Sequence, residues 1–283
     1  MIIQITKTKN ELFLIKEMLP IWQKYVDGFV FFDDKSTDGT YEYLTENKHK
    51  FNILSILKNE LQDDQLAVES NERQLLYDEA LKHSTNIICL DTDEYLDGTL
   101  GKEQLEQVLE KNKNTIFYLQ WVQYTDTNQI RVDGPWRTNY KPRIGSYNER
   151  VLFKAAQMHS EHLPHTGMKQ GVIQVPNLFI AHLQWLDKPT VAVKQYFWKI
   201  TDYVNKLKFN ADTIPASAYD ASVNNFDWSY DIFNIPLKVD PKIYDKHDIK
   251  NSYKYKFIKE NVKKHNIPNL NDWSMNIHES VKD

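Results

Sequence analysis

What this sequence lacks already narrows the kind of protein it encodes. Its one cysteine, Cys89, has no partner for an internal disulfide, and its apolar surroundings predict burial in a reducing compartment. No apolar run approaches the roughly 20 residues that span a bilayer. The net charge of −4 argues against nucleic-acid binding, which depends on clustered lysine and arginine. These absences exclude a disulfide scaffold and disfavour membrane-spanning and nucleic-acid-binding proteins.

The amino terminus, MIIQITKTKNE, also lacks the longer apolar segment of a secretory signal peptide. Internal repeats and low-complexity segments are absent. We therefore expect a soluble, cytoplasmic protein without a transmembrane segment.

Aromatic residues, by contrast, are abundant. The 16 Tyr and 7 Trp exceed what a core of this size needs. Sugar-binding clefts often use such rings, but an aromatic-rich core explains them equally well. Trp121, Trp136 and Trp185 are candidate stacking faces for a sugar.

Strand and helix signals alternate through the first hundred residues. Short apolar segments that predict strands are separated by segments with apolar residues at helical spacing. Strands connected through helices imply crossover connections and a mainly parallel sheet, so we expect an α/β fold with a Rossmann-like sheet flanked by helices. The expected strands are 2–6, 28–32, 53–57 and 86–91, and the expected helices are 10–26, a segment after residue 38, and 65–83.

The pattern changes after residue 98. We expect strands at 115–124, 150–154 and 177–185, and loops with a hairpin over 125–150. Helices are expected at 102–111, 189–208 and around 249–265. One domain of residues 1–235 is predicted, with a nucleotide-binding half (1–100) and an acceptor half (101–235). A Lys-rich helical extension, residues 236–283, follows, and its charges are expected to form a solvated face.

The segment NIICLDTDEY, residues 86–95, is the most informative in the chain. An apolar strand ends there in Asp91, Asp93 and Glu94. Open α/β sheets bind ligands at the carboxyl ends of their strands. Two carboxylates at this spacing can share a hard divalent cation, which also offsets the cost of placing like charges together. Mn²⁺ or Mg²⁺ suits this oxygen-rich pair better than zinc held by histidines.

A second acidic strand end, FVFFDDKSTDGT at 29–40, repeats this arrangement. Asp34, Ser36, Asp38 and Gly39 fall at the first, third, fifth and sixth positions of a calcium loop. The twelfth position is Thr45 rather than the required Glu, so this alternative is rejected. Asp34 can instead hydrogen-bond a base or ribose. Thr37 and Asp38 are expected to cap the helix that follows.

These motifs carry a resemblance. T-K-T-K-N-E (6–11), F-D-D-K-S-T-D-G-T (32–40) and C-L-D-T-D-E-Y (89–95) resemble successive signatures of family 2-like glycosyltransferases with the GT-A fold. The resemblance implies transfer of a sugar from a nucleotide-diphosphate sugar to a glycan or other hydroxyl acceptor, with inversion, in glycan synthesis. It implies the following roles: Thr8, Lys9 and Asp34 for the nucleotide, Asp91 for diphosphate and metal, and Asp93 as the more direct metal ligand.

Further residues are candidates for the same reaction. The Q-x-x-Y-D segment at 74–78 is similar to this group, and Arg73 beside it could reach the diphosphate with its planar fork. The second half matches the family through Arg150, Phe153 and Lys154, the segment HSEHLPH (159–165), and His182, a candidate further metal ligand. Catalysis also needs a base for the acceptor hydroxyl, and the candidates are Glu161, which we favour, Asp133 and His165.

Three alternatives stay open. A phosphatase of the haloacid dehalogenase group would use the first Asp of the D-x-D motif as nucleophile, although that group has Gly and then Thr or Val where Glu94 and Tyr95 stand. A nucleotidyltransferase could use the same kind of fold. A non-catalytic glycan- or nucleotide-binding module would keep the fold without turnover.

Overall fold

The computed structural model describes residues 1–60, 69–154, 160–165, 168–209, 219 and 228–265. The chain divides into two compact units. Unit 1 comprises Met1–Val122 and Gly134–His182, and unit 2 comprises Gln123–Asp133 and Leu183–Asp283. The boundary expected after residue 235 stays a prediction. Within the described residues, no helix combines the length and the apolarity needed to cross a bilayer.

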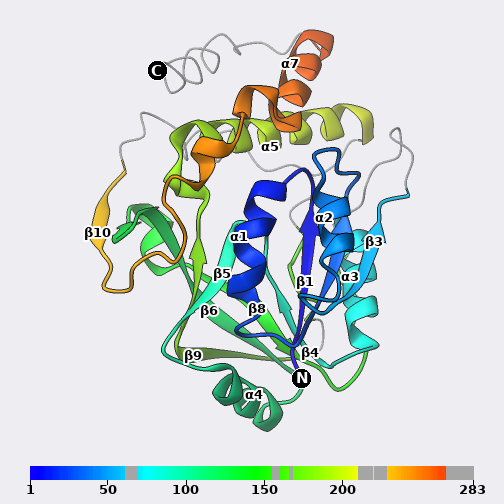
Figure 1. The fold of residues 1–283 in the computed structure, drawn as a ribbon, viewed down its shortest axis with the longest axis vertical. Helices are drawn as coiled ribbons and strands as arrows, with labels where there is room; N and C mark the ends of the chain where they lie inside the picture. The colour runs from blue at the N-terminus through cyan, green and yellow to red at the C-terminus, as the bar shows by residue number, and fades with distance from the viewer. Residues whose placement is uncertain (61–68, 155–159, 166–167, 210–218, 220–227, 266–283) are drawn as a thin grey trace. The chain divides into compact units, whose positions relative to one another are not determined.

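Unit 1 contains a mixed sheet with the order β6-β8-β4-β1-β2-β3 (Figure 1). Strands β4, β1, β2 and β3 run parallel, whereas β8 is antiparallel to both β4 and β6. The expected α/β fold is confirmed, but the sheet is mixed rather than mainly parallel, because the strands after β4 pair antiparallel. The strands are β1 (Ile3–Thr8), β2 (Gly28–Asp33), β3 (Ile53–Lys58), β4 (Asn86–Cys89), β5 (Glu94–Gly98), β6 (Thr115–Asp126), β8 (Tyr140–Ser146) and β9 (Lys169–His182). The helices are α1 (Leu12–Trp22), α2 (Thr40–Glu46), α3 (Glu69–Leu81), α4 (Lys102–Lys111) and the 3-10 helix η1 (Gly134–Thr138).

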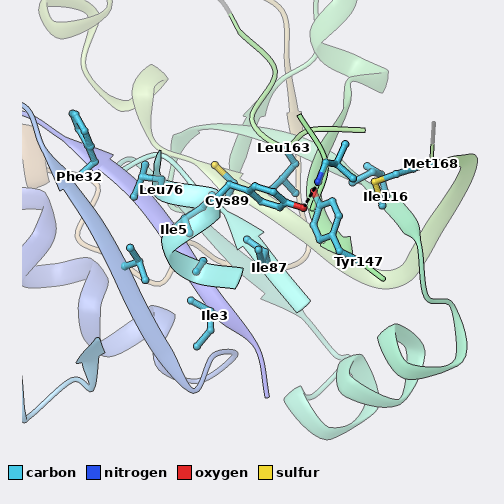
Figure 2. Packing of buried hydrophobic residues seen from close by; sticks show 14 residues of the cluster. Ile3, Ile5, Phe32, Leu76, Ile87, Cys89, Ile116, Tyr147, Leu163 and Met168 are labelled. Atoms are coloured by element: carbon cyan, nitrogen blue, oxygen red, sulfur yellow. Dashed lines mark hydrogen bonds between the residues drawn. The ribbon is translucent and has the colours of Figure 1, made fainter. Parts of the chain in front are cut away.

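One face of the parallel strands packs against α3. Successive side chains of a strand point to opposite faces, so alternate residues of β1, β2 and β4 share this core with α3. Burial of one large aliphatic or aromatic side chain contributes about 1.5–3 kcal/mol to the stability of the fold. Cys89 belongs to this cluster as predicted, and burial raises the pKa of its thiol to about 12. The cluster, shown in Figure 2, includes Ile3, Ile5, Val30, Phe32, Leu76, Tyr77, Ala80, Ile87 and Cys89.

The opposite face packs against α1. The Trp22 ring lies 6.2 Å from Phe29 and 6.4 Å from Phe31, both on β2. Helix α1 contains Pro20 and ends two residues later, at Trp22. Asp38 joins the two neighbouring helices, because one of its carboxylate oxygens accepts from the backbone N–H of Leu12 and the other from that of Thr40. Asp38 thus accepts the first N–H of α2, as expected, although the N-cap residue is Gly39. The expected capping by Thr37 was wrong, because its backbone N–H and its hydroxyl donate to Asn10 instead.

Several expectations for the chain were wrong. Strand β8 lies within the segment 125–150, which was expected to form loops with a hairpin, and it pairs with both β4 and β6. The segment 150–154 is not a strand. Strand β5, immediately after the D-x-D motif, was not anticipated, because Asp97 and Gly98 read as a turn. Gly98 instead pairs with Leu178 of β9, at φ +142°, where an added Cβ would lie 2.0 Å from the Asn177 carbonyl oxygen. Residues 65–68 of the expected helix 65–83 and His159 lie outside the described residues.

Unit 2 contains the end of β6, the short strands β7 and β10, and helices. Strand β7 pairs antiparallel with both β6 and β10. The Arg131 guanidinium lies over the rings of Trp185 and Trp228, at 4.3 and 4.9 Å from their centroids. The elements are β7 (Gln129–Arg131), η2 (Gln184–Leu186), α5 (Lys188–Phe209), β10 (Tyr230–Ile232), η3 (Ile243–Lys246), η4 (Ile249–Asn251) and α7 (Tyr253–His265).

Candidate functional site

The carboxyl ends of β1 and β2 meet at one edge of the unit 1 sheet. Thr8 pairs with Asp33 in the parallel register, and the Thr8 carbonyl accepts a hydrogen bond from the backbone N–H of Asp34 over 2.9 Å. Thr8 is buried, and its hydroxyl finds no hydrogen-bond partner among the described residues. The register therefore places Thr8 beside Asp34.

Asp34 lies between two donors at this edge. Lys9 Nζ donates to one carboxylate oxygen over 3.1 Å, and the Asn59 amide at the end of β3 donates to the other over 2.6 Å. Burial would raise the pKa of Asp34, but the Lys7 and Lys9 charges and these hydrogen bonds outweigh it and lower the pKa. Asp34 is therefore an ionised acceptor held in a fixed orientation.

Asp91, the first acid of the D-x-D motif, lies among three nitrogen-containing side chains. Its Oδ2 lies 3.0 Å from His162 Nε2 and 3.6 Å from Arg143 Nη2, and its Oδ1 lies 3.9 Å from Arg73 Nη2. Burial would raise the pKa of Asp91, but these neighbours hold it well below its ordinary range. Asp91 therefore stays ionised, with its charge offset by the protein itself.

His162 is neutral at physiological pH. Burial and then the charges of Arg143 and Arg73 lower its pKa to about 4, against the opposing effect of Asp91. An ionised carboxylate can only accept hydrogen bonds, so we assign the imidazole proton to Nε2, where it is donated to Asp91. His162 thus fixes the orientation of Asp91.

Arg73 is held by Glu69 on the same helix. Its Nε and Nη2 donate to Glu69 Oε1 over 3.1 and 2.9 Å, and the other Glu69 oxygen accepts from the backbone N–H of Ser160 over 3.0 Å. Arg73 is buried. Arg73 therefore contacts Asp91 and Glu69, and Glu69 in turn ties the segment that carries His162 to α3.

Glu94 is the fully buried centre of the turn. Its Oε1 accepts from Arg143 over 2.6 Å and from the Trp121 indole over 2.8 Å, while Oε2 accepts from the Asp91 backbone N–H over 3.1 Å. Its carbonyl accepts from the Trp22 indole of α1 over 2.7 Å. These contacts fix the backbone that presents Asp91.

Asp93, the second acid of the motif, lies against His182. Asp93 Oδ2 is 3.4 Å from His182 Nε2, and both residues are buried. The contact arises because Glu94 and His182 pair across β5 and β9. The Trp121 ring stacks on His182 with centroids 4.4 Å apart and an interplanar angle of 23°. The structure thus brings together two of the predicted metal ligands, 89 residues apart in sequence, and places Asp91 in a different set of contacts.

The side chains of Asp93 and His182 fit a divalent cation whose remaining coordination positions are filled by a bound substrate. Asp93 offers a carboxylate and His182 an imidazole at one buried point. Across the part of the chain that the structure describes, no group of three or more His, Cys, Asp or Glu residues could hold a metal by itself. Mg²⁺ and similar cations are commonly held by one or two protein ligands together with substrate phosphates and water. The arrangement is therefore compatible with that kind of site.

The Q-x-x-Y-D segment of α3 anchors the chain after β8. Gln74 Oε1 accepts from the Phe153 N–H over 2.9 Å, and the Tyr77 hydroxyl accepts from the Val151 N–H over 3.1 Å. Arg150 donates twice to Asp78, over 2.7 Å each. The motif therefore holds residues 150–153 in place of the strand that was expected there.

The candidate bases have different surroundings. Glu161 is 40% exposed, and its Oε2 lies 2.9 Å from His165 Nδ1. Asp133, in unit 2, accepts from Arg131 over 2.7 and 2.6 Å. Burial would raise the pKa of Asp133, but Arg131 lowers it, which makes this carboxylate a weaker base. Both catalytic assignments stay predictions.

Sequence reasoning assigned no role to four residues at the site: Glu94, Lys141, Arg143 and His162. Arg143 is the additional residue of a bulge in β8, since Ile144 pairs with Phe117 and Pro142 with Tyr118. Bulges re-aim side chains, and this one falls in a segment read as loop. His162 lies within the H-S-E-H segment that resembles the family, but the sequence did not show that its partner is Asp91.

The sequence matches no family model and no curated protein. Solved structures with similar folds include S. aureus TarS, at 15% identity and a TM-score of 0.43, covering 80% of this chain and 42% of that one. S. aureus TarS 1-349 in complex with UDP matches at 15% identity and a TM-score of 0.39, covering 80% and 70%. The mannosyltransferase PcManGT from Pyrobaculum calidifontis, in complex with GDP-Man and Mn²⁺, matches at 19% identity and a TM-score of 0.30, covering 44% and 36%.

This chain spans less than half the length of the first TarS chain. With TM-scores below 0.5, the roles of individual residues rest on the contacts described above.

Proposed function

We propose that this chain is a metal-dependent glycosyltransferase that moves a sugar from a nucleotide-diphosphate sugar to a hydroxyl acceptor. The contact between Asp93 and His182, at 3.4 Å, carries the proposal. Both side chains are buried. Asp93 follows the end of β4, which pairs with β1 and its terminal residue Thr8, and Asp34 follows β2 on the other side of β1. A carboxylate and an imidazole would both hold a cation, and the diphosphate would complete its ligands.

The strand-end residues would bind the nucleotide. Asp34 is ionised and oriented by Lys9 and Asn59, so it would accept a hydrogen bond from a base or ribose. Thr8 lies beside it with an unpartnered hydroxyl among the described residues. Arg73 is engaged with Glu69, so we propose that it acts at the diphosphate through Asp91.

The chemistry would depend mainly on positioning and electrostatics. When bound, a divalent cation stabilises the charge that develops on the leaving diphosphate. Glu161 would accept the proton of the acceptor hydroxyl as its oxygen bonds to the anomeric carbon and the bond to the nucleoside diphosphate breaks. One such displacement inverts the anomeric carbon. Its neighbour His162 contacts Asp91, which holds this part of the chain near the D-x-D motif.

Calorimetry with a panel of nucleotide-diphosphate sugars, with and without Mn²⁺, tests the proposal. We expect one donor class to bind only with the cation, and Asp93→Ala to abolish that binding and any transfer or hydrolysis. Glu103→Ala, an exposed acid on α4, is the control for loss of one carboxylate. Circular dichroism checks that each variant folds.

Three results would point elsewhere. Full activity in Asp93→Ala would overturn the metal assignment. Cation-dependent binding without turnover would favour a binding module. Phosphate release from simple phosphomonoesters, with no donor binding, would favour a phosphatase.

A further inference from the structure

Lys141 is a half-buried lysine of the site, and no carboxylate among the described residues forms an ion pair with it. Among the described residues, its ammonium makes no hydrogen bond or ion pair, and its one recorded contact is with the Trp121 ring, 4.8 Å from the centroid. The lysines at the end of β1 differ, because Lys7 pairs with Glu72 and Lys9 with Asp34. The ammonium group of Lys141 could therefore bind an anion.

The sheet register places Lys141 at the site. Lys141 pairs with Leu119 of β6, so Trp121, two residues further, is its diagonal neighbour on the same face. The Trp121 ring also stacks on His182, and its indole donates to Glu94. One ring therefore contacts both the proposed cation ligand and the lysine.

The electrostatic surroundings favour an added anion. Burial and then the Arg143 charge lower the pKa of Lys141, and Glu94 and Asp91 oppose this effect only in part. Arg143 itself is buried, and its Nε and Nη1 have no hydrogen-bond partner among the described residues. Arg143 is paired with Glu94, so Lys141 is the cation of β8 that the nearby acids compensate only in part, and a phosphate oxygen beside Lys141 would supply the balancing charge.

We propose that Lys141 is an anion-binding residue of this site and donates to a phosphate oxygen of the bound diphosphate. The assignment rests on the proposed function for the identity of the ligand, but its charge requirement stands on the contacts above. Lysine binds phosphate as a compact point charge, which suits a leaving group that gains charge as its bond to the sugar breaks.

Binding of inorganic pyrophosphate with Mn²⁺, measured by calorimetry, tests the assignment on the full chain. Lys141→Met keeps the length of the side chain and its packing on Trp121 but removes the charge. We expect this variant to bind pyrophosphate roughly 10- to 100-fold more weakly, and Lys141→Arg to bind it nearly as tightly as the unmodified chain. Lys24→Met, at an exposed lysine, is the matched control and is expected to change nothing.

Unchanged pyrophosphate affinity in Lys141→Met, or no pyrophosphate binding by the unmodified chain, would overturn the inference. The two proposals can fail separately. Pyrophosphate binding that depends on Lys141, without binding of any nucleotide-sugar, would support the anion site and refute the donor assignment. Sugar transfer unaffected by Lys141→Met would support the donor assignment and refute the anion site.

Discussion

Arg143 donates a hydrogen bond to Glu94 over 2.6 Å, and both side chains are almost completely buried. A buried ion pair is costly to desolvate, and its main effect is seen when one partner is removed. Glu94 also accepts from the Trp121 indole and from the backbone of Asp91. The pair therefore connects the backbone of the D-x-D motif to β6 and β8.

Removing Glu94 should destabilise the protein strongly. Glu94→Ala leaves the Arg143 charge buried without its carboxylate, which costs about 3–5 kcal/mol in comparable pairs. Glu94→Gln keeps the shape and one acceptor, so we expect a smaller loss of unfolding free energy. Urea denaturation monitored by tryptophan fluorescence measures both. Equal stability of Glu94→Ala and the unmodified chain would contradict the structural role assigned to this pair.

Acid should weaken the folded state through His162. Its folded pKa of about 4 lies below the ordinary value of 6.5, so the unfolded chain takes up a proton first as the pH falls. The contribution of His162 therefore leaves the unfolding free energy unchanged above pH 6.5 and lowers it as the pH falls from 6.5 towards 4. The decrease is at most about 3 kcal/mol, and it is smaller for a ring that is 23% exposed.

Replacement of His162 isolates this contribution. His162→Gln cannot titrate, but its amide can still donate to Asp91. We expect its unfolding free energy to fall less than that of the unmodified chain between pH 7 and pH 5, measured by urea denaturation at each pH. Identical losses in the two proteins would show that His162 does not titrate as described.

The two acids of the D-x-D motif should differ in metal binding. Asp93→Asn replaces a proposed ligand, and we expect Mn²⁺ affinity in the presence of a bound donor to fall more than tenfold, as it does when metal-site contacts are lost. Asp91→Asn should retain more of the affinity, because Asp91 contacts His162 and two arginines. Titration of Mn²⁺ followed by electron paramagnetic resonance ranks the variants. The opposite ranking would identify Asp91 as the ligand.

The anchor between α3 and residues 150–153 should depend on its buried contact. Tyr77→Phe removes the acceptor of the Val151 N–H, at a cost of about 1–3 kcal/mol for an unsatisfied buried donor. Arg150→Ala removes an exposed ion pair, so we expect it to destabilise the protein less than Tyr77→Phe does. Thermal unfolding of both variants tests the order. A larger effect of Arg150→Ala would mean that the exposed pair holds the segment.

The parallel half of the fold was predictable because its signals are local. Apolar strands ending in acids gave β2 and β4, and their shared edge followed from the rule for parallel strands. Strand β5 was missed because its pairing partner, β9, lies some 80 residues away, and no local signal marks such a pairing. The bulge that presents Arg143 was missed for the same reason.

By itself, the sequence determined which candidate site residues follow the carboxyl ends of the parallel strands. These are Lys9 after β1, Asp34 after β2, and Asp91 and Asp93 after β4. Tertiary structure alone decided how the two acids of the D-x-D motif divide. Asp91 contacts His162 and the arginines, whereas Asp93 faces His182. This division depends on the pairing of β5 with β9 and on the placement of residues 160–165 against α3. Such contacts join distant parts of the chain, and side-chain spacing along one strand cannot specify them.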